Sequence, residues 1–80
     1  DSIFDYIRLS DQYSIMEVTP LKEWLGKNVI QANIRAKYHL NVLAVKNAGG
    51  DISMPGVEYT FNDKDHLIVM GQQKDLDKLF

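Results

Sequence analysis

The chain has 80 residues, a formal net charge of −2, 45% hydrophobic residues and 25% charged residues. This composition predicts one small folded domain with a thin core and argues against disorder. No segment collects Lys or Arg densely, which argues against a protein that wraps a nucleic-acid backbone. The aliphatic run from Leu67 to Met70 falls far short of the roughly 20 residues of a membrane-spanning helix, so we expect a soluble chain. The lack of cysteine excludes disulfides, cysteine-ligated zinc and thiol catalysis.

Residues 1–12 are predicted to form a connecting helix. Asp1 and Ser2 can cap it, and the side chains of Ile3, Phe4 and Ile7 fall on one apolar stripe. Because the chain begins without a methionine, we expect this helix to lead from a missing upstream domain of a longer protein. Residues 13–18 are β-prone and end before a proline, which predicts the first strand.

A helix and a buried strand are predicted in the middle of the chain. Residues 21–25 are expected to form one helical turn that closes at Gly26, a residue suited to a positive φ. Asn28 is then expected to cap a longer helix over residues 29–38, whose apolar side chains recur at four-residue spacing. Residues 42–45 are a continuous β-prone run, which predicts a central strand buried on both faces.

The C-terminal half combines turns, strands and a last helix. Gly49-Gly50 predicts a hairpin turn rather than a phosphate loop, because it joins two extended segments instead of opening a helix. An extended piece at residues 52–54, a half-buried strand at residues 57–61 and a buried strand at residues 67–70 are expected next. Gly71 is expected to release the chain into a helix with Leu76, Leu79 and Phe80 on one side. These elements predict a small α+β domain with helices on a mainly antiparallel sheet.

The chain offers little for catalysis or for metal binding. Its serines have no base beside them in sequence, and nothing resembles a nucleophile elbow. Asp65 and His66 are neighbours, but successive strand residues point to opposite faces, so we do not expect them to cooperate. His39 is explained by its place at a helix end. Four acidic residues lack the spacing of a calcium loop and are expected on the solvated surface: Asp63, Asp65, Asp75 and Asp77.

Arg35 gives the strongest indication of a binding site. An arginine near a helix C-terminus is ordinarily a solvated charge that favours the helix dipole. Its sequence neighbours combine an apolar helix stripe with a polar strand entrance: Val29, Ile30, Ile34, Asn41 and Val42. A guanidinium beside such a stripe and an amide suits a ligand that has both a phosphate and a flat base.

An ordered set of motifs resembles one protein family. A lysine follows a glycine at Gly26-Lys27, Arg35 stands near the helix end, and Asn41-Val42 opens a strand. Later, the charged turn at Asp65-His66 leads into a buried strand ending at Gly71. From about residue 14 to residue 80 the chain resembles the RCK_C domain, also called TrkA-C, and we assign residues 13–80 to it. The resemblance implies the C-terminal regulatory lobe of a cytosolic Ktr- or Trk-type subunit that gates a potassium channel or transporter, with no enzymatic activity.

The resemblance also implies partners. RCK_C domains pair as two-fold dimers, and this lobe would follow an upstream RCK_N-type domain and act on a membrane-embedded potassium transporter subunit at the inner face of the cell membrane. The stripe of Val29, Ile30 and Ile34 separately predicts a homodimer, because so thin a core would otherwise leave these side chains exposed. We expect no nucleic-acid partner and no direct membrane insertion.

In the Ktr-like branch of the family, the groove across the dimer interface binds cyclic di-AMP. This regulatory ligand is itself two-fold, so it matches the symmetry of an isologous interface. By position, Arg35 would contact a phosphate, Asn41 would hydrogen-bond the ligand, and Pro55 would close the groove. The residues that would line the adenines are Val29, Ile30, Ile34 and Val42. Leu40 departs from the family pattern, because many members have a small residue there.

Two other interpretations stay open at this point. The first keeps the fold but makes the domain a purely structural dimerisation lobe, with any small-molecule sensing confined to the upstream domain. The second is an enzyme domain that uses Asp65, His66 or Glu58, which activity screening of a His66→Ala variant would test.

Overall fold

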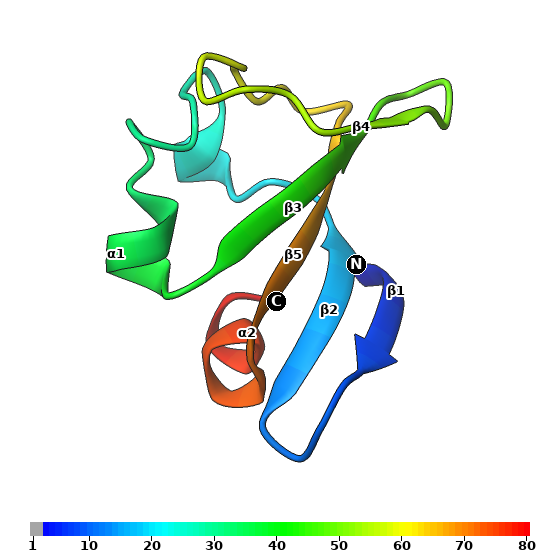
Figure 1. Cartoon of the computed structure of the whole chain (residues 1–80). Helices are drawn as coiled ribbons and strands as arrows, with labels where there is room; N and C mark the ends of the chain where they lie inside the picture. Colours follow the sequence, from blue (N-terminus) through cyan, green and yellow to red (C-terminus); the bar gives the residue numbers. More distant parts are fainter. Residues whose placement is uncertain (1–2) are drawn as a thin grey trace.

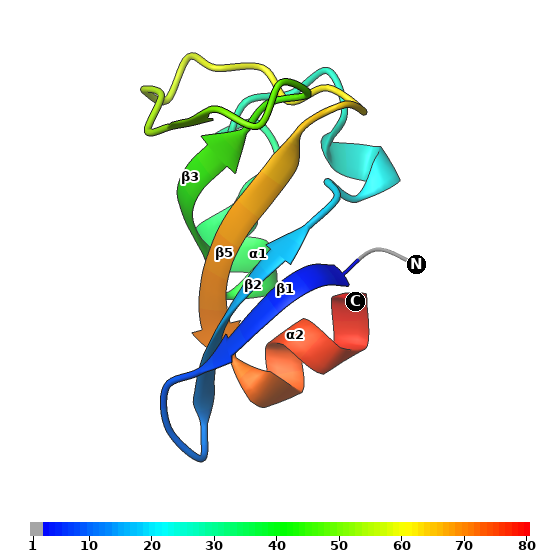
Figure 2. The same cartoon turned by 90° about the vertical axis from the view of Figure 1, so that its right-hand side faces the viewer.

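A twisted antiparallel sheet organises the chain (Figures 1 and 2). The computed structural model describes residues 3–80. In chain order its elements are β1 (Ile3–Arg8), β2 (Tyr13–Val18), the 3-10 turn η1 (Lys22–Trp24), α1 (Ile34–Tyr38), β3 (Asn41–Lys46), β4 (Ile52–Ser53), β5 (His66–Gln72) and α2 (Gln73–Leu79). The strand order is β1-β2-β5-β3-β4 and every pairing is antiparallel, which confirms the expected α+β fold.

The core lies on one face of this sheet. Side chains alternate along β2 and β5, so Met16 and Val18 are buried beside Leu67 and Val69. The helices cover this face through a few fully buried side chains, such as Leu76 of α2. The predictions of a buried strand at residues 67–70 and of a final helix with an apolar face are therefore confirmed.

Trp24 of η1 occupies the centre of the core. Its side chain is fully buried and meets the rings of Tyr38 and Phe80 edge-on, with centroid distances of 5.3 and 6.3 Å. The indole Nε1 is buried without a hydrogen-bond partner among residues 3–80. The helical turn expected here is confirmed, and Gly26 closes it with a φ of 79°.

The connecting helix predicted for the first twelve residues is wrong over the described part. Residues 3–8 form β1, which pairs with β2 from Ile3↔Val18 to Arg8↔Ser14. Ile3, Phe4, Tyr6 and Ile7 are β-branched or aromatic, and a partner strand that follows after a short turn favours the extended form over an isolated helical turn. The expected cap at residues 1 and 2 lies outside the described residues.

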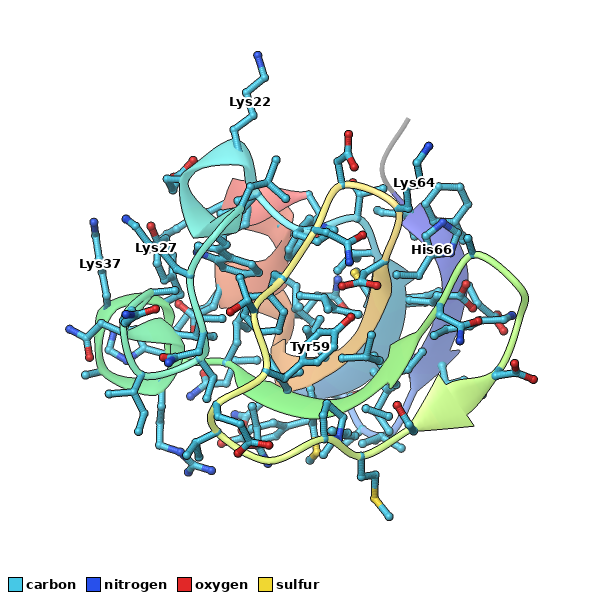
Figure 3. All side chains as sticks on the ribbon, turned by 90° about the horizontal axis from the view of Figure 1, so that it is seen from above. Lys22, Lys27, Lys37, Tyr59, Lys64 and His66 are labelled. Atoms are coloured by element: carbon cyan, nitrogen blue, oxygen red, sulfur yellow. The ribbon has the colours of Figure 1, made fainter. Side chains whose placement is uncertain are left out.

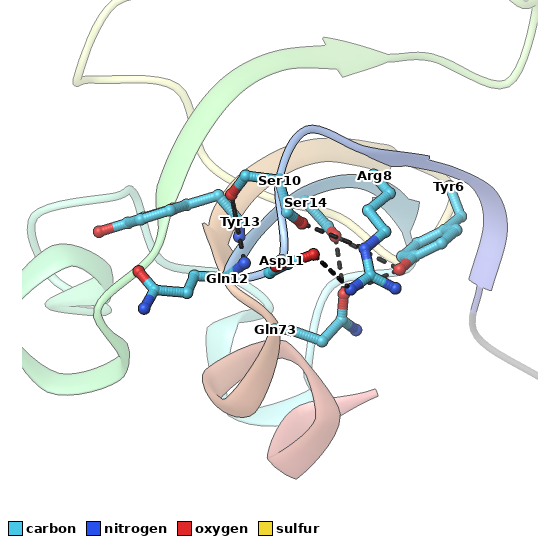
Figure 4. Close-up of polar contacts among 8 residues, drawn as sticks. All are labelled: Tyr6, Arg8, Ser10, Asp11, Gln12, Tyr13, Ser14 and Gln73. Carbon is cyan, nitrogen blue, oxygen red and sulfur yellow. Dashed lines mark hydrogen bonds and ion pairs between the residues drawn. The ribbon is translucent and has the colours of Figure 1, made fainter.

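A polar cluster fixes this hairpin to the start of α2 (Figure 4). The hydroxyls of Tyr6 and Ser14 both donate to Gln73 Oε1, at 2.8 and 2.7 Å. At the turn, Ser10 Oγ accepts hydrogen bonds from the backbone N–H groups of Gln12 and Tyr13. β1, β2 and α2 are thus joined by side-chain hydrogen bonds as well as by the ladder.

The helix expected over residues 29–38 is shorter than predicted. Asn28 Oδ1 does accept the N–H groups of Ile30 and Gln31, as a cap would, but these residues form turns. Asn33 adopts a left-handed conformation with a φ of 55°, and this interrupts the helix, so that α1 begins only at Ile34. Asparagine tolerates this conformation better than most residues, which explains why the break falls there.

The strand expected at residues 57–61 is also wrong. Tyr59 N–H closes a turn on Gly56 O, and the backbone of Phe61 bonds to Gly26 and Lys27 instead of to a strand. The alternation of Tyr59 and Phe61 with polar residues is real, because both rings turn inward, but the segment is a loop that packs without a ladder.

Smaller corrections concern the ends of strands and the acidic residues. β3 and β4 form where they were expected, joined by a turn with Gly50 at a φ of 88°, but the middle strand of the sheet is β5. Gly71 lies within β5, and the final helix begins two residues later. Asp65 and Asp75 are only 2% and 7% exposed, so they do not belong to the solvated surface, whereas Asp63 and Asp77 do.

Candidate functional site

A groove of about 300 Å³ follows the open edge of β3. β4 pairs only with Val45 and Lys46, so residues 41–44 have β5 on one side and no strand on the other among residues 3–80. The groove is lined by the turns that lead into α1, by α1 itself, by β3 and by the loop after β4. The lining residues are Val29, Arg35, Asn41, Val42, Leu43, Ala44, Val45, Pro55, Gly56, Val57, Tyr59 and Phe61. We call the loop of residues 55–61 the lip.

Arg35 and Asn41 meet at one end of this groove. Arg35 Nη2 donates a hydrogen bond to Asn41 Oδ1 at 3.0 Å, and both residues are exposed. The chain can reverse between them because His39 takes a left-handed conformation with a φ of 62°, and its N–H bonds to Arg35 O. Among residues 3–80 no carboxylate forms an ion pair with Arg35. The site therefore presents an uncompensated positive charge, which suits an anionic group.

The predicted site residues are brought together only in part. Five of the seven line the groove: Val29, Arg35, Asn41, Val42 and Pro55. Ile30 is 66% exposed and lies beside the groove, in a shallow hollow over α1 that Val29 and Arg35 share. Ile34 borders the same hollow, but it is 0% exposed and belongs to the core, so it offers a ligand almost no accessible surface in the single chain.

The lip contributes groove residues that the sequence analysis missed. The Tyr59 hydroxyl donates to Asp65 Oδ2 at 2.7 Å, and in Figure 3 its side chain points inward while Lys22 and Lys37 point outward. The hydrogen bond to Asp65, with burial and the carboxylate charge adding to it, raises the pKa of Tyr59 to about 12. Two inward aromatic residues after Pro55-Gly56 were visible in the sequence, but a strand was the simpler explanation for their spacing.

Asp65 and His66 bond to separate partners, and Glu58 lies exposed in the lip. Asp65 is engaged by Tyr59 and by the N–H of Asn62, at 2.7 and 3.1 Å. His66 lies on the other face of β5, where its Nδ1 contacts Glu17 Oε2 at 2.7 Å.

The surroundings of His66 account for its position. Its ring stacks on Phe4 with a centroid distance of 4.0 Å, which attaches β1 to β5, and Glu17 also pairs with Lys46 at 3.6 Å. Within residues 3–80 no group of three or more His, Cys, Asp or Glu side chains could hold a metal ion. In the same part of the chain, no helix has the length and apolarity needed to cross a membrane.

The fold and the groove together define the class of domain. Over 88% of this chain and 82% of the other, the structure superimposes with a TM-score of 0.74 and 31% identity on the RCK C domain of the potassium transport protein KtrA in complex with cyclic diadenosine monophosphate. A second match, to the GsuK RCK domain, has a TM-score of 0.73 over 95% of this chain and 17% of the other; at 22% identity it supports the fold alone.

The sequence matches lead to the same family. The TrkA-C domain model matches residues 13–80, and the chain belongs to this family, as the sequence motifs indicated. Two curated relatives from Bacillus subtilis (strain 168) are the Ktr system potassium uptake proteins A and C, at 37% identity over 95% of this chain and 30% identity over 98%. The chain spans about a third of the length of these relatives.

Proposed function

We propose that the chain is the C-terminal regulatory lobe of a cytosolic Ktr-type subunit, and that two copies bind one cyclic di-AMP across their two-fold axis to control potassium uptake. The lobe acts without enzymatic activity of its own. In this proposal residues 1–12 connect it to an upstream RCK_N-type domain, and the whole subunit works on a membrane-embedded potassium transporter at the inner face of the cell membrane.

The observation that carries this proposal is the position of Arg35. Its guanidinium has no acidic partner among residues 3–80, is oriented by Asn41 and stands in a groove whose lining residues are mostly apolar. A phosphate would suit the guanidinium that lacks an acidic partner, and a flat adenine would suit the groove. The resemblance to a solved domain in complex with this nucleotide adds support, because that match covers most of both chains.

The exposed apolar surface beside the groove supports the dimer. Ile30 is 66% exposed and Val29 lies next to it in the same hollow, so association of two copies would cover both. Each copy would then contribute one Arg35 and one Asn41 to a symmetric ligand. Binding would favour one dimer arrangement by its differential affinity and so pass a signal to the upstream domain.

Calorimetric titration with cyclic di-AMP, cyclic di-GMP and AMP tests the proposal. We expect binding of cyclic di-AMP alone, at about one ligand per two chains. Because a symmetric dimer loses two charge-assisted contacts at once, Arg35→Ala should weaken binding at least ~100-fold. Arg8→Ala is the matched control, since Arg8 is an exposed arginine of the β1–β2 hairpin that pairs with Asp11.

The exposed hollow around Ile30 also favours the purely structural alternative. A chain that is dimeric in sedimentation but binds none of the three nucleotides would be a dimerisation lobe, and the sensing site would have to be sought upstream. A monomer that binds cyclic di-AMP one to one would contradict the shared site.

A further inference from the structure

Asp65 is a buried carboxylate outside the groove that is hydrogen-bonded to the lip through Tyr59. It stands just before β5, is 2% exposed and forms no ion pair with Lys, Arg or His among residues 3–80. Asp65 accepts hydrogen bonds from two uncharged donors, the hydroxyl of Tyr59 and the N–H of Asn62. A buried carboxylate that lost either donor would carry a large desolvation cost, so these bonds resist opening.

Tyr59 transmits this restraint to the groove. Its ring lines the groove, while its hydroxyl is occupied by Asp65 at 2.7 Å. The same contact raises the pKa of Tyr59 to about 12, and it commits the hydroxyl proton to Asp65. Tyr59 therefore presents to the groove a ring in a fixed orientation and has no free hydroxyl proton to offer a ligand.

The far end of the lip is also fixed. Phe61 is 3% exposed, and its ring meets that of Tyr59 edge-on with a centroid distance of 6.1 Å. Its backbone N–H donates to Lys27 O and its carbonyl accepts from Gly26 N–H, both at 2.9 Å. Phe61 is thus tied to the residues that follow η1, and the Tyr59–Asp65 bond adds a restraint on the middle of the lip.

We propose that Asp65 is a positioning residue of the groove, which acts through Tyr59 to hold the lip closed and to present the tyrosine ring to a planar base. This inference rests on the proposed function, since it assigns a role in binding the same nucleotide. Tyr59 becomes a ligand-contacting residue through its ring, and Asp65 touches no ligand.

The test compares Tyr59→Phe, Asp65→Ala, which removes the acceptor oxygen, and the double variant by calorimetric titration with cyclic di-AMP, well below their melting temperatures. Tyr59→Phe keeps the ring and removes only the tether, so we expect roughly tenfold weaker binding. Because both substitutions remove the same bond, the double variant should bind about as well as either single variant. Tyr6→Phe and Asp75→Ala are the matched controls: they remove another bonded hydroxyl and another buried carboxylate, away from the groove.

Hydrogen exchange of the nucleotide-free chain gives a second readout that does not depend on binding. In Tyr59→Phe the amide of Tyr59, which donates to Gly56 O, should exchange at least ~10-fold faster, while amides of β5 keep their wild-type rates. Equal affinities in wild type and Tyr59→Phe, or unchanged exchange in the lip, would overturn the role of Asp65 and leave the proposed function standing. Failure of the wild-type chain to bind cyclic di-AMP would instead overturn the proposed function.

Discussion

Gly71 is a position at which one added methyl group is expected to disturb the fold. It is buried in β5 opposite Ser14 of β2, beneath the chain reversal that follows α1. A Cβ built there would lie 2.5 Å from Leu40 Cδ2 and 3.3 Å from the carbonyl oxygen of His39. Leu40 is 2% exposed and belongs to the core, so its side chain can move away only if its packing in the core changes.

The cost of Gly71→Ala follows from this contact. Forcing one extra carbon into a packed core costs about 2 kcal/mol, since neighbours must leave their preferred rotamers or shift the backbone. A domain of this size has a free energy of unfolding of about 4 to 12 kcal/mol, so the loss is a substantial part of it. The melting temperature should fall by about 10 °C.

Urea denaturation followed by the fluorescence of Trp24, the one tryptophan in the sequence, measures this loss. Gly49→Ala is the control: the nearest atom to its added Cβ is Asn47 Oδ1 at 3.4 Å, and we expect a change of less than ~0.5 kcal/mol. Leu40→Val removes the obstructing atom, so Gly71→Ala should cost clearly less in that background. Wild-type stability of Gly71→Ala, or equal costs in both backgrounds, would contradict the packing described here.

Two further predictions concern pH and assembly. Since the pKa of Tyr59 is raised from 10.0 to about 12, the folded chain keeps between these pH values a proton that the unfolded chain releases, and stability should fall as pH rises through that window. Urea midpoints at pH 9 and pH 11.5 measure this loss of stability. Tyr59→Phe should lose less stability than the wild type between these pH values, and equal losses in the two proteins would contradict the prediction. Ile30→Asp should shift the dimer towards monomer in sedimentation by placing two charges at the two-fold interface, whereas Ile52→Asp, at a similarly exposed isoleucine (64% against 66%), should not. If both variants stay dimeric, the interface lies elsewhere.

The sequence predicted best those elements whose pattern is set by burial. β2 and β5 carry one buried face each, and α2 places Leu76 on the core, so local periodicity and tertiary packing favour the same structure. The motif set could therefore identify the family from short segments. Arg35 and Asn41 were also predictable as a pair, because a helix end followed at once by a strand brings residues six apart together.

The elements that failed depend on interactions that no local pattern contains. The stripe of Ile3, Phe4 and Ile7 fits a helix, and only the pairing with β2 makes the segment a strand. The left-handed conformation of Asn33 sets where α1 begins. Several asparagines of this chain could adopt that conformation, so the sequence pattern does not indicate which one does.

The candidate site shows the same division. Tyr59 and Phe61 have strand-like spacing, but Tyr59 N–H bonds to Gly56 O within the lip, and the backbone of Phe61 bonds to Gly26 and Lys27. Asp65 looks like a surface residue in sequence, because its burial depends on a tyrosine hydroxyl six residues away. The wall of the groove built by β3 and the first residue of the lip, Pro55, were thus accessible to sequence reasoning, whereas the rest of the lip was not.

The short pairing of β4 with β3 has a consequence for solubility. An uncovered strand edge presents backbone donors and acceptors to solution, where they can template pairing with a strand of another molecule and begin aggregation. Over residues 41–44 the lip is the segment that stands along this edge, and Pro55 within it cannot donate to an added ladder. A variant selected for a wider groove would expose more of the edge, so easier entry for larger ligands would come with a greater tendency to self-associate.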